Sequence, residues 1–570
     1  MTTDNSAPYN SARYNSAPYN SAPYNSAPYN SAPYNAAPYN AGHWLLDRNI
    51  EAGRGENVAI RSRGISYTYN DVLRSTWRAQ NALAILGVPL GERVVLLAND
   101  GPDMVAWLIG CLRSGVIPIP VSTMLTGADV GMIANDAQAL VIIASPEFEP
   151  LIAPAAGRAT SLRHAVLLDE SSGVPTEPTG TETIGSETVG SETVATAGGL
   201  NWSAWSTYTS DSEAPLAATT ADSAAIWLYS SGTTGLPKGV MHSHGSMQAT
   251  YETYARKVLE VTPNDRFLSV AKLFFAYGLG NSLTFPFGAG ATAILEPSRP
   301  APLFYCNLIS DEAPTLFFAS PGFVAGVLDT DIPVAAFSSV RATITAGETL
   351  PADLQRRFSE RFEHPVLDGI GSTEALHIFL SNTLDDQRPG STGVAVPGYE
   401  LRLTGEDNLD VVEPDAPGYL HVRGPSTATG YWNRREATDA AFGADGWVKT
   451  GDVYTCSADG HWTFLGRNND MIKAGGIWVS PAEVEAVLVE HPDVLEAAVV
   501  GTRNDAGLEE VTAFLVPKAG RTIDSGAIDT HCRDRMAAFK RPRRLIVVDS
   551  FPKTATGKIQ RFALRDRLAG

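Results

Sequence analysis

One segment of the sequence has residue types that could hold a phosphate group. Residues 229–240 read YSSGTTGLPKGV and follow the apolar run AAIWL at 224–228. The segment combines hydroxyl donors, glycines that let the backbone fold around an anion, and one cation, namely Ser230, Ser231, Gly232, Thr233, Thr234, Gly235 and Lys238. It differs from the P-loop of GTPases, because Lys238 lies between Pro237 and Gly239 and does not precede Ser or Thr. We interpret it as a phosphate-binding loop.

Five further segments carry polar residues of similar kinds. They are 368–374 (DGIGSTE), 430–432 (GYW), 449–452 (KTGD), 466–473 (GRNNDMIK) and 552–558 (PKTATGK). Together with the phosphate loop, and in this order, they closely resemble the signature segments of the adenylate-forming superfamily. That superfamily includes acyl- and aryl-CoA ligases, luciferases and the adenylation domains of peptide synthetases. The resemblance covers essentially everything from His43 onward.

The resemblance implies a role for each segment in adenylation, in which a carboxylate attacks the α-phosphate of ATP. Because both partners are negative, catalysis depends on positioning and on charge neutralisation. Lys558 would reach the carboxylate and the α-phosphate, Thr373 would bond the α-phosphate, and Glu374 would bind Mg²⁺. The other ATP contacts would come from Asp452 and Arg467 at the ribose, from Ala346, Gly347, Glu348 and Asp368 beside adenine, and from Gly369, Ile370, Gly371 and Ser372.

Two segments predict the acid that is activated. Residues 269–281 (SVAKLFFAYGLGN) and 371–382 (GSTEALHIFLSN) look like those of benzoate-CoA ligases and their hydroxybenzoate and aminobenzoate relatives. By that resemblance the acid would be surrounded by Ala276, Tyr277, Gly278, Ala346, Gly347, Gly371, His377 and Ile378. A flat ring packs well between an aromatic face and small residues, in a short pocket. His377 could instead serve a polar ring substituent, so benzoate and hydroxybenzoate both stay open.

The carboxy-terminal part predicts the acceptor and a hinge. Gly475 and Gly476 resemble the segment that lines the pantetheine tunnel of CoA. The run FKRPRR at 539–544 concentrates positive charge, which suits the phosphates of CoA, and the family positions are Phe539, Arg541 and Arg543. In the family a small domain rotates between the two half-reactions about a hinge Asp or Lys. Asn469 stands at that position here.

The chain alternates short apolar runs with amphipathic stretches, which predicts parallel sheets covered by helices. Apolar runs lie at 94–97, 140–144 and 165–168, and helices are expected at 69–86, 103–114 and 481–488. We therefore predict an α/β protein. A large N-terminal adenylation domain (43–468), with two helix-covered sheets and a small β-barrel-like subdomain, would precede a small mobile α+β domain (469–570).

Two repeats lie outside this pattern. The unit Asn-Ser-Ala-Pro-Tyr recurs from Asn5 to Asn40, and its regular prolines and small polar residues predict a disordered tail over 1–42. We expect removal of the tail to leave turnover intact. A second pentamer recurs at 180–194 within a Ser/Thr/Gly-rich stretch, so 171–222 is expected to be a low-complexity insertion loop.

Composition excludes several classes of protein. The 62 acidic against 43 basic residues give a net charge of -19, which disfavours nucleic acid as a partner. Four scattered cysteines without CxxC spacing suggest neither a zinc site nor a disulfide framework, and a reducing cytoplasm fits. Because no apolar run approaches the roughly 20 residues that span a bilayer, no membrane segment is expected. A homodimer is left open.

The leading hypothesis is an AMP-forming aryl-CoA ligase that uses ATP, Mg²⁺ and coenzyme A on a benzoate-type acid. The alternative is an aryl-acid adenylating enzyme that loads a separate carrier protein. A non-catalytic nucleotide-binding scaffold is the third hypothesis. The retention of Lys238, Glu374, Asp452, Arg467 and Lys558 argues against it, because a degenerate scaffold need not keep all five.

Overall fold

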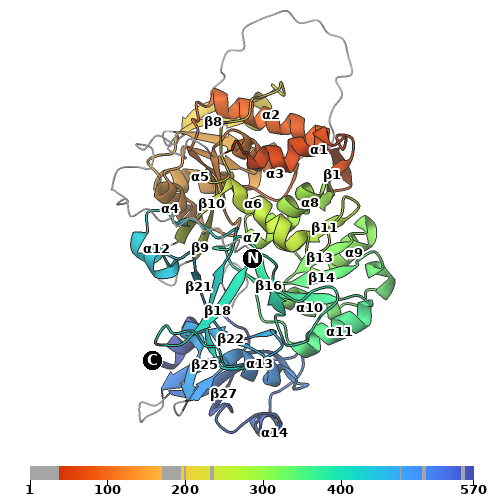
Figure 1. Cartoon of the computed structure of the whole chain (residues 1–570), viewed down its shortest axis with the longest axis vertical. Helices are drawn as coiled ribbons and strands as arrows, with labels where there is room; N and C mark the ends of the chain where they lie inside the picture. Colours follow the sequence, from red (N-terminus) through yellow and green to blue (C-terminus); the bar gives the residue numbers. More distant parts are fainter. Residues whose placement is uncertain are drawn as a thin grey trace, which may run out of the picture.

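The protein is described by a computed structural model. The structure describes residues 37–169, 194–197, 200–231, 237–474, 477–503, 509–553 and 559–569. Figure 1 shows a large N-terminal part, coloured from red to cyan, above a smaller C-terminal part in blue. Among the described residues, none of the helices has the length and apolar character needed to cross a membrane.

The largest sheet lies in the N-terminal part. Over the described residues its strand order is β17-β16-β15-β14-β13-β11-β12-β1-β2, and its centre from β15 to β1 is parallel. The strands are β1 (Val58–Ser62), β2 (Ile65–Thr68), β11 (Arg266–Ser269), β12 (Thr292–Ile294), β13 (Leu316–Ala319), β14 (Ala342–Thr345), β15 (Val366–Gly371), β16 (Ile378–Ser381) and β17 (Val394–Ala395). Because both faces are covered, β13 and β14 are buried along their whole length.

A second sheet has the order β4-β3-β5-β6-β8-β7 over the described residues. Its strands are β3 (Arg93–Leu97), β4 (Ile117–Pro120), β5 (Val141–Ala144), β6 (His164–Leu167), β7 (Val194–Ala197) and β8 (Leu200–Ala204). The predicted apolar runs form β3, β5 and β6. The predicted helices at 69–86 and 103–114 form α2 (Tyr69–Ile85) and α3 (Pro102–Arg113), and Thr68 and Asp71 close a capping box on α2.

The range that we predicted for the insertion loop, 171–222, extends too far at its C-terminal end. Residues 200–204 form β8, which pairs in parallel with β6, and Trp205 is buried against Trp107 with ring centroids 5.0 Å apart. Because the stretch is rich in Ser, Thr and Gly, its overall composition does not reveal these buried aromatic residues. Burial of their large rings stabilises the fold by more than the neighbouring polar residues destabilise it. The pentamer repeat at 180–194 lies outside the described residues, apart from Val194.

Two smaller sheets complete the N-terminal part. The order β20-β10-β9 joins β9 (Ala224–Ser231), β10 (Pro237–Ser243) and β20 (Gly430–Tyr431). The expected barrel-like subdomain is an antiparallel sheet, β18-β19-β21-β22, with register shifts in two of its pairs. Its strands are β18 (Glu400–Thr404), β19 (Gly418–Arg423), β21 (Val448–Cys456) and β22 (Trp462–Arg467).

Helices cover these sheets and complete the N-terminal part. They include α1 (Arg48–Glu51), α4 (Gly127–Ala137), α5 (Glu149–Ala156), α6 (His244–Thr250), α7 (Ala276–Leu279), α8 (Phe285–Ala289), α9 (Pro302–Glu312), α10 (Pro321–Leu328), α11 (Ala352–Phe362) and α12 (Arg435–Ala441). Figure 1 shows α9, α10 and α11 together on one side of the largest sheet.

The C-terminal part has its own sheet, in the order β25-β26-β27, and a two-stranded hairpin, β23-β24. The bounds are β23 (Ile472–Ala474), β24 (Ile477–Val479), β25 (Val494–Arg503), β26 (Glu509–Pro517), β27 (Arg544–Val547), α13 (Pro481–Val489), α14 (Ser525–Arg535) and α15 (Arg561–Ala569). Its buried apolar residues form clusters separate from those of the N-terminal part. The predicted α/β class with a large and a small domain is confirmed.

The end of the predicted tail packs onto the N-terminal domain. Asn40 is buried, and its Nδ2 donates to Leu112 O at 3.0 Å and to Thr219 Oγ1 at 3.2 Å. Its Oδ1 accepts from Gly42 N at 2.9 Å, and the backbone of Tyr39 bonds to that of Thr219. Residues 37–42, which we assigned to the repeat tail, therefore belong structurally to the domain, and residues 1–36 lie outside the described residues.

Candidate active site

The strands on either side of the predicted phosphate loop are paired. In the antiparallel pair of β9 and β10, Ser230 lies opposite Lys238, so both side chains are on the same face. Of the predicted loop residues, Gly232, Thr233, Thr234 and Gly235 lie outside the described residues, as do the side-chain surroundings of Ser231. The structure thus places the two ends of the loop side by side.

Glu374 and Lys238 are connected through Tyr431. The Tyr431 hydroxyl donates to Glu374 Oε1 at 2.8 Å, and Lys238 Nζ lies 5.0 Å from the centre of the Tyr431 ring. Burial and the neighbouring Glu374 carboxylate raise the pKa of Tyr431, so its hydroxyl keeps its proton. Sequence reasoning noted the GYW segment but gave Tyr431 no role.

The turn that carries Thr373 is held by buried polar residues. His242 Nε2 donates to the carbonyl oxygen of Thr373 at 2.8 Å, and Ser372 Oγ accepts from Ala375 N at 3.1 Å. Burial lowers the pKa of His242 to about 4, so the ring is neutral and its Nε2 acts as the donor. The side chains of Thr373 and Glu374 stay partly exposed, where a ligand can reach them.

Asp452 and Arg467 face each other across β21 and β22. Arg467 Nε lies 3.1 Å from Asp452 Oδ1, and Arg467 also donates to Thr450 O at 3.0 Å. The Asp452 carboxylate is buried, whereas about half of the Arg467 side chain, 53%, is exposed. Burial raises the pKa of the neighbouring Tyr454, and the Asp452 carboxylate raises it further.

The predicted adenine-flanking residues follow two neighbouring strands. Asp368, Gly369, Ile370 and Gly371 belong to β15, and Ala346, Gly347 and Glu348 follow β14. Because β14 and β15 are parallel, these residues lie at the same edge of the sheet, where open α/β sheets bind ligands. In the structure the Glu348 carboxylate accepts from Gly322 N at 3.0 Å, at the start of α10.

The Asp368 side chain is partly buried at this edge. Thr345 Oγ1 donates to Asp368 Oδ1 at 3.2 Å. Burial raises the pKa of Asp368 to about 8, because the low-dielectric interior disfavours the charged carboxylate. The side chain is therefore largely protonated at neutral pH, and it adds little negative charge beside the predicted nucleotide site.

His377 lies in a cluster of aromatic rings with Tyr254, Tyr277 and Phe285, which we call the aromatic cluster. The centroid of the His377 ring lies 5.5 Å from that of Tyr254, 5.5 Å from that of Tyr277 and 4.5 Å from that of Phe285. His377 Nε2 donates to Asn281 Oδ1 at 3.1 Å, and the Tyr277 hydroxyl donates to Ile344 O at 3.0 Å. Burial lowers the pKa of His377 to about 3, so the cluster carries no charge at neutral pH.

Three glycines make room for this arrangement. A Cβ on Gly280 would lie 2.2 Å from Cδ2 of His377, one on Gly371 would lie 2.5 Å from the carbonyl oxygen of His377, and one on Gly278 would lie 2.0 Å from that of Lys272. At distances this short, a Cβ atom would force its neighbours to shift. Ile378 is buried next to Gly369, and Ala276 is partly exposed at the start of α7.

Sequence reasoning missed the residues that support the predicted ones. His242, Tyr254, Asn281, Phe285 and Tyr431 bond to or pack against predicted site residues. Asn281 and Tyr431 stand inside segments that were singled out, which is the only signal that could have found them. His242, Tyr254 and Phe285 reach the site through the fold, and neither their residue type nor their spacing marks them.

The predicted residues of the C-terminal part lie on its surface or outside the described residues. Phe539 packs at the margin of the apolar core, Arg541 Nε donates to Met536 O at 3.2 Å, and the Arg543 side chain is exposed. At the hinge, Arg565 of α15 donates to Asn469 O at 3.3 Å. Lys558, Gly475 and Gly476 lie outside the described residues.

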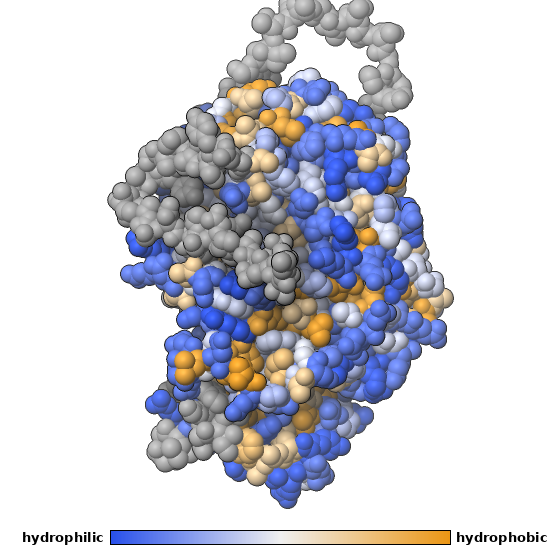
Figure 2. Space-filling model, viewed as in Figure 1, coloured by the Kyte–Doolittle hydropathy of each residue, from blue (hydrophilic) through white to orange (hydrophobic). Residues whose placement is uncertain are grey.

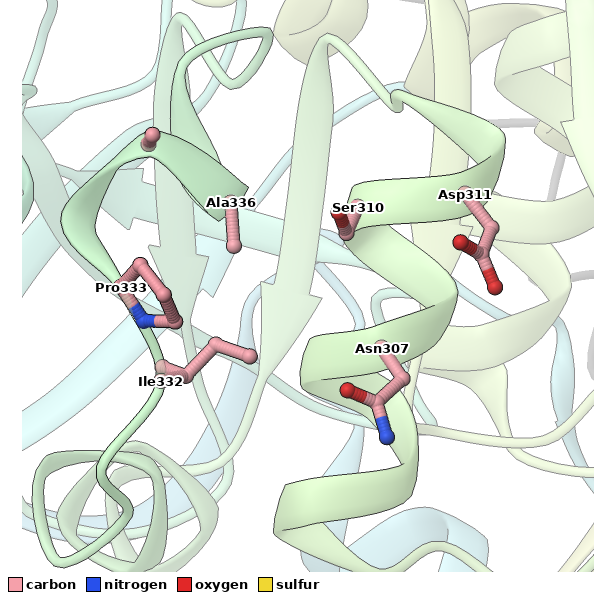
Figure 3. A pocket seen from close by; sticks show the side chains of 7 residues that line it. Asn307, Ser310, Asp311, Ile332, Pro333 and Ala336 are labelled. Carbon is pink, nitrogen blue, oxygen red and sulfur yellow. The ribbon is translucent and has the colours of Figure 1, made fainter.

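One cavity lies next to the predicted phosphate loop, and a second lies apart from the predicted site residues. A cavity of about 210 Å³ borders the phosphate loop, where Asp136 accepts from the Tyr229 hydroxyl at 2.8 Å and from Arg434 at 2.6 Å. Figure 3 shows a second one, of about 480 Å³, between α9 and the segment around Pro333. It contains none of the predicted residues; its lining is Asn307, Ser310, Asp311, Ile332, Pro333, Ala335 and Ala336.

A large α/β domain followed by a small α+β domain is the architecture of the adenylate-forming enzymes. A family model described as AMP-binding enzyme matches residues 46–432, and one described as AMP-binding enzyme C-terminal domain matches residues 483–558. The chain belongs to the AMP-binding enzyme family and to its benzoate-CoA ligase-like subfamily.

Three relatives illustrate the range of this similarity. A benzoate-CoA ligase of Thauera aromatica is 40% identical over 91% of this chain and 94% of its own length. The crystal structure of an anthranilate-CoA ligase in complex with anthranoyl-AMP matches 93% of this chain and 98% of that one, with 34% identity and a TM-score of 0.84. A p-hydroxybenzoic acid–AMP ligase of Mycobacterium marinum is 34% identical over 91% of this chain and 68% of its own length.

Proposed function

We propose that this protein is an AMP-forming aryl-CoA ligase, which converts an aromatic carboxylate, ATP and CoA into aryl-CoA, AMP and diphosphate. The observation that carries the proposal is the placement of an uncharged aromatic cluster at the sheet edge that also bears Asp368 and Glu374. The high similarity to a benzoate-CoA ligase over nearly its whole length supports the same activity. Fold alone would not assign a substrate.

In the first half-reaction a carboxylate oxygen attacks the α-phosphorus of ATP, which forms the aryl-adenylate and releases diphosphate. We infer that Lys238 and the hydroxyls of the phosphate loop neutralise the phosphates, and that Thr373 bonds the α-phosphate. Asp452 and Arg467 would hold the ribose, and residues 346–348 and 368–372 would flank adenine. Lys558 would bring a positive charge to the reacting oxygens.

Glu374 is the residue that we propose for Mg²⁺. Its carboxylate is partly exposed and is held by the Tyr431 hydroxyl. Mg²⁺ is usually bound by one or two carboxylates together with substrate phosphates, and among the described residues no group of three acidic, His or Cys side chains could hold a metal ion. A single carboxylate therefore fits this cation, which would supply charge neutralisation at the phosphates when bound.

In the second half-reaction the CoA thiol attacks the carbonyl carbon of the adenylate, and AMP leaves. We infer that Phe539, Arg541 and Arg543 contact the nucleotide of CoA and that Gly475 and Gly476 line the path of its thin arm. The C-terminal domain would turn about Asn469 between the two steps. Arg565, which bonds to Asn469 O and lies 3.2 Å from Asp470, would support one of the two orientations.

For the acid, we infer that Ala276, Tyr277, Gly278, His377 and Ile378 surround the ring. The relatives act on benzoate, anthranilate and p-hydroxybenzoic acid by their names, so the acid is a benzoate or a benzoate with a small ring substituent. Because Nε2 of the neutral His377 ring donates to Asn281, its Nδ1 can accept one hydrogen bond, which suits a hydroxyl or amino substituent but not a second carboxylate.

The alternative function is that of an aryl-acid adenylating enzyme that loads a carrier protein. The p-hydroxybenzoic acid–AMP ligase favours it, because that relative forms an adenylate by name and is similar over the same 91% of this chain. We prefer free CoA because the basic run at 539–544 stands out in a protein with a net charge of -19.

The experiment that tests the proposal measures AMP and thioester with ATP, Mg²⁺ and a panel of acids, with and without CoA. The panel contains benzoate, hydroxybenzoates, aminobenzoates, cinnamates and short aliphatic acids. We expect a thioester that depends on CoA and on a benzoate. Adenylate formation without any CoA thioester would support the carrier-protein function, and activity only with aliphatic acids would refute the aryl assignment.

Two further parts of the proposal concern location and assembly. The four cysteines are free, which fits a reducing cytoplasm, and we infer a cytoplasmic enzyme. A homodimer stays a prediction, and light scattering of the purified protein would measure its mass in solution.

A further inference from the structure

We propose that Tyr431 is a positioning residue that holds the Mg²⁺-binding carboxylate of Glu374 and the phosphate-loop lysine Lys238 in register with each other. This inference rests on the proposed function, because it assigns Tyr431 a role toward the cation and the phosphates of ATP. Tyr431 would act through the two charged residues and would not touch the reacting atoms.

The hydroxyl and the ring of Tyr431 contact two different charged residues. The hydroxyl donates to Glu374 Oε1 at 2.8 Å, and the face of the ring lies 5.0 Å from Lys238 Nζ. A donor fixes the direction of one carboxylate oxygen, and a ring face attracts a cation without removing its charge. A single side chain thereby sets the separation of an anion and a cation that would otherwise pair directly or drift apart.

Tyr431 is itself held in place. It is buried, its backbone belongs to β20 opposite Val240 of β10, and its backbone N donates to Thr438 Oγ1 at 3.0 Å. The Phe442 ring packs edge-on against it with centroids 5.3 Å apart. Because β10 also carries Lys238, the strand pairing fixes the tyrosine and the lysine on one rigid element.

The backbone around Glu374 is tied to the same strands. Ala428 N donates to Glu374 O at 2.7 Å, and Thr429 N donates to Met241 O at 2.9 Å. The chain from 428 to 431 thus bridges the turn that carries Glu374 and the strand that follows the phosphate loop. This bridge gives the GYW segment a structural connection to the phosphate loop, although none of its residues has a charge.

The test uses Tyr431→Phe, which removes only the hydroxyl and keeps the ring beneath Lys238. We would measure the dissociation constant of ATP by calorimetry in EDTA and at increasing Mg²⁺ concentration, with the full-length protein. We expect ATP affinity in EDTA to stay the same and the Mg²⁺ concentration for half-maximal tightening to rise roughly tenfold, because the bond to a charged group is lost. Tyr208→Phe, which removes a hydroxyl that bonds to Ser203 at 2.8 Å, is the matched control.

A double-mutant cycle separates positioning from a general loss of structure. In a Glu374→Gln background, Tyr431→Phe should have no further effect on the Mg²⁺ dependence, since its partner charge is already absent. Equal effects in both backgrounds, or unchanged Mg²⁺ dependence in Tyr431→Phe, would overturn the inference alone. A wild-type protein that binds ATP without any Mg²⁺ dependence would overturn the proposed role of Glu374, and this inference with it.

Discussion

The aromatic cluster and the charged residues around the predicted phosphate loop differ in charge and in exposure to water. The cluster of Tyr254, Tyr277, Phe285 and His377 is neutral, because burial keeps the imidazole unprotonated. Lys238, Glu374, Asp452 and Arg467, which we call the charged edge, lie in paired or partly exposed positions.

This difference indicates how the protein would select the acid and how it would bind the phosphates of ATP. Burial in a low-dielectric interior makes an unpaired charge costly, so the cluster can accept a ring but not a charged ring substituent. At the charged edge, water and counter-charges lower that cost, so phosphates can be bound and exchanged. With the proposed function, choice of the acid would thereby be separated from the chemistry on ATP, and a change in one region should leave the other intact.

The largest effect is expected on adenylate formation. Lys558→Ala should slow adenylate formation about 100-fold or more, because one preorganised charge toward the reacting oxygens is lost. Thioester formation from supplied aryl-adenylate should be nearly unchanged, and so should the KM for the acid. Diphosphate release and thioester formation, followed in separate assays, measure the two steps. Equal losses in both steps would contradict the division of roles.

A smaller effect is expected from crowding of the aromatic cluster. Gly280→Ala places a methyl group against the His377 ring and should raise the KM for the acid roughly tenfold, since overpacking costs about 1–3 kcal/mol. The KM for ATP should not change. Gly110→Ala, whose Cβ would lie 2.8 Å from that of Ala79, is the control for crowding far from the cluster. A change in both KM values would mean that the two regions are not independent.

Asp368 lies between the aromatic cluster and the charged edge, and its ionisation should make the stability of the folded protein depend on pH. Its pKa is raised to about 8, so its contribution to stability is complete below its ordinary pKa of 3.8 and is lost as the pH rises through 8. From pH 5 to pH 8 the wild type should lose on the order of 3 kcal/mol relative to Asp368→Asn. Melting temperatures of both proteins at the two pH values measure this. Parallel pH profiles would show that Asp368 is ionised in the folded protein.

The smallest kinetic effect is expected far from both regions, at Asn40. Asn40→Ala removes a helix cap and several buried hydrogen bonds, which should cost about 1–2 kcal/mol and lower Tm by a few degrees. Both KM values should be unchanged.

A deletion provides the matched control for Asn40→Ala. Removal of residues 36–40 joins Asn35 to Ala41 and brings the identical Pro-Tyr-Asn of residues 33–35 before Ala41. This variant should melt like the wild type. A loss of stability equal to that of Asn40→Ala would show that the docked copy of the repeat cannot be replaced by the next one.

Much of the fold followed from local patterns. Apolar runs gave β3, β5 and β6 because buried parallel strands need side chains that are apolar on both faces. The helix predicted at 69–86 from its amphipathic pattern is Tyr69–Ile85 in the structure, where Thr68 caps its start. Residues 200–208 were assigned to a loop because their neighbours are polar, and only the sheet and the Trp107 ring show that they are buried.

Candidate site residues could be predicted from the sequence where they stand inside a recognisable motif. Glu374, Asp452 and Arg467 stand in short segments that resemble the motifs of the family, and the structure places Asp452 and Arg467 in contact. Tyr254 and Phe285 could not be found in this way, since an aromatic residue in a helical segment is usually a core residue. Only the fold brings them to His377, from positions that are far apart in the sequence.

The most direct test of the separation compares kcat/KM for benzoate with that for 4-carboxybenzoate in the wild-type enzyme, with CoA and ATP at saturation. The two acids share the reacting carboxylate and differ only in a charge that would lie in the aromatic cluster. An uncharged cluster predicts that the second carboxylate lowers kcat/KM about 100-fold or more, because burial of an unpaired charge costs several kcal/mol. Similar values for the two acids would contradict the account.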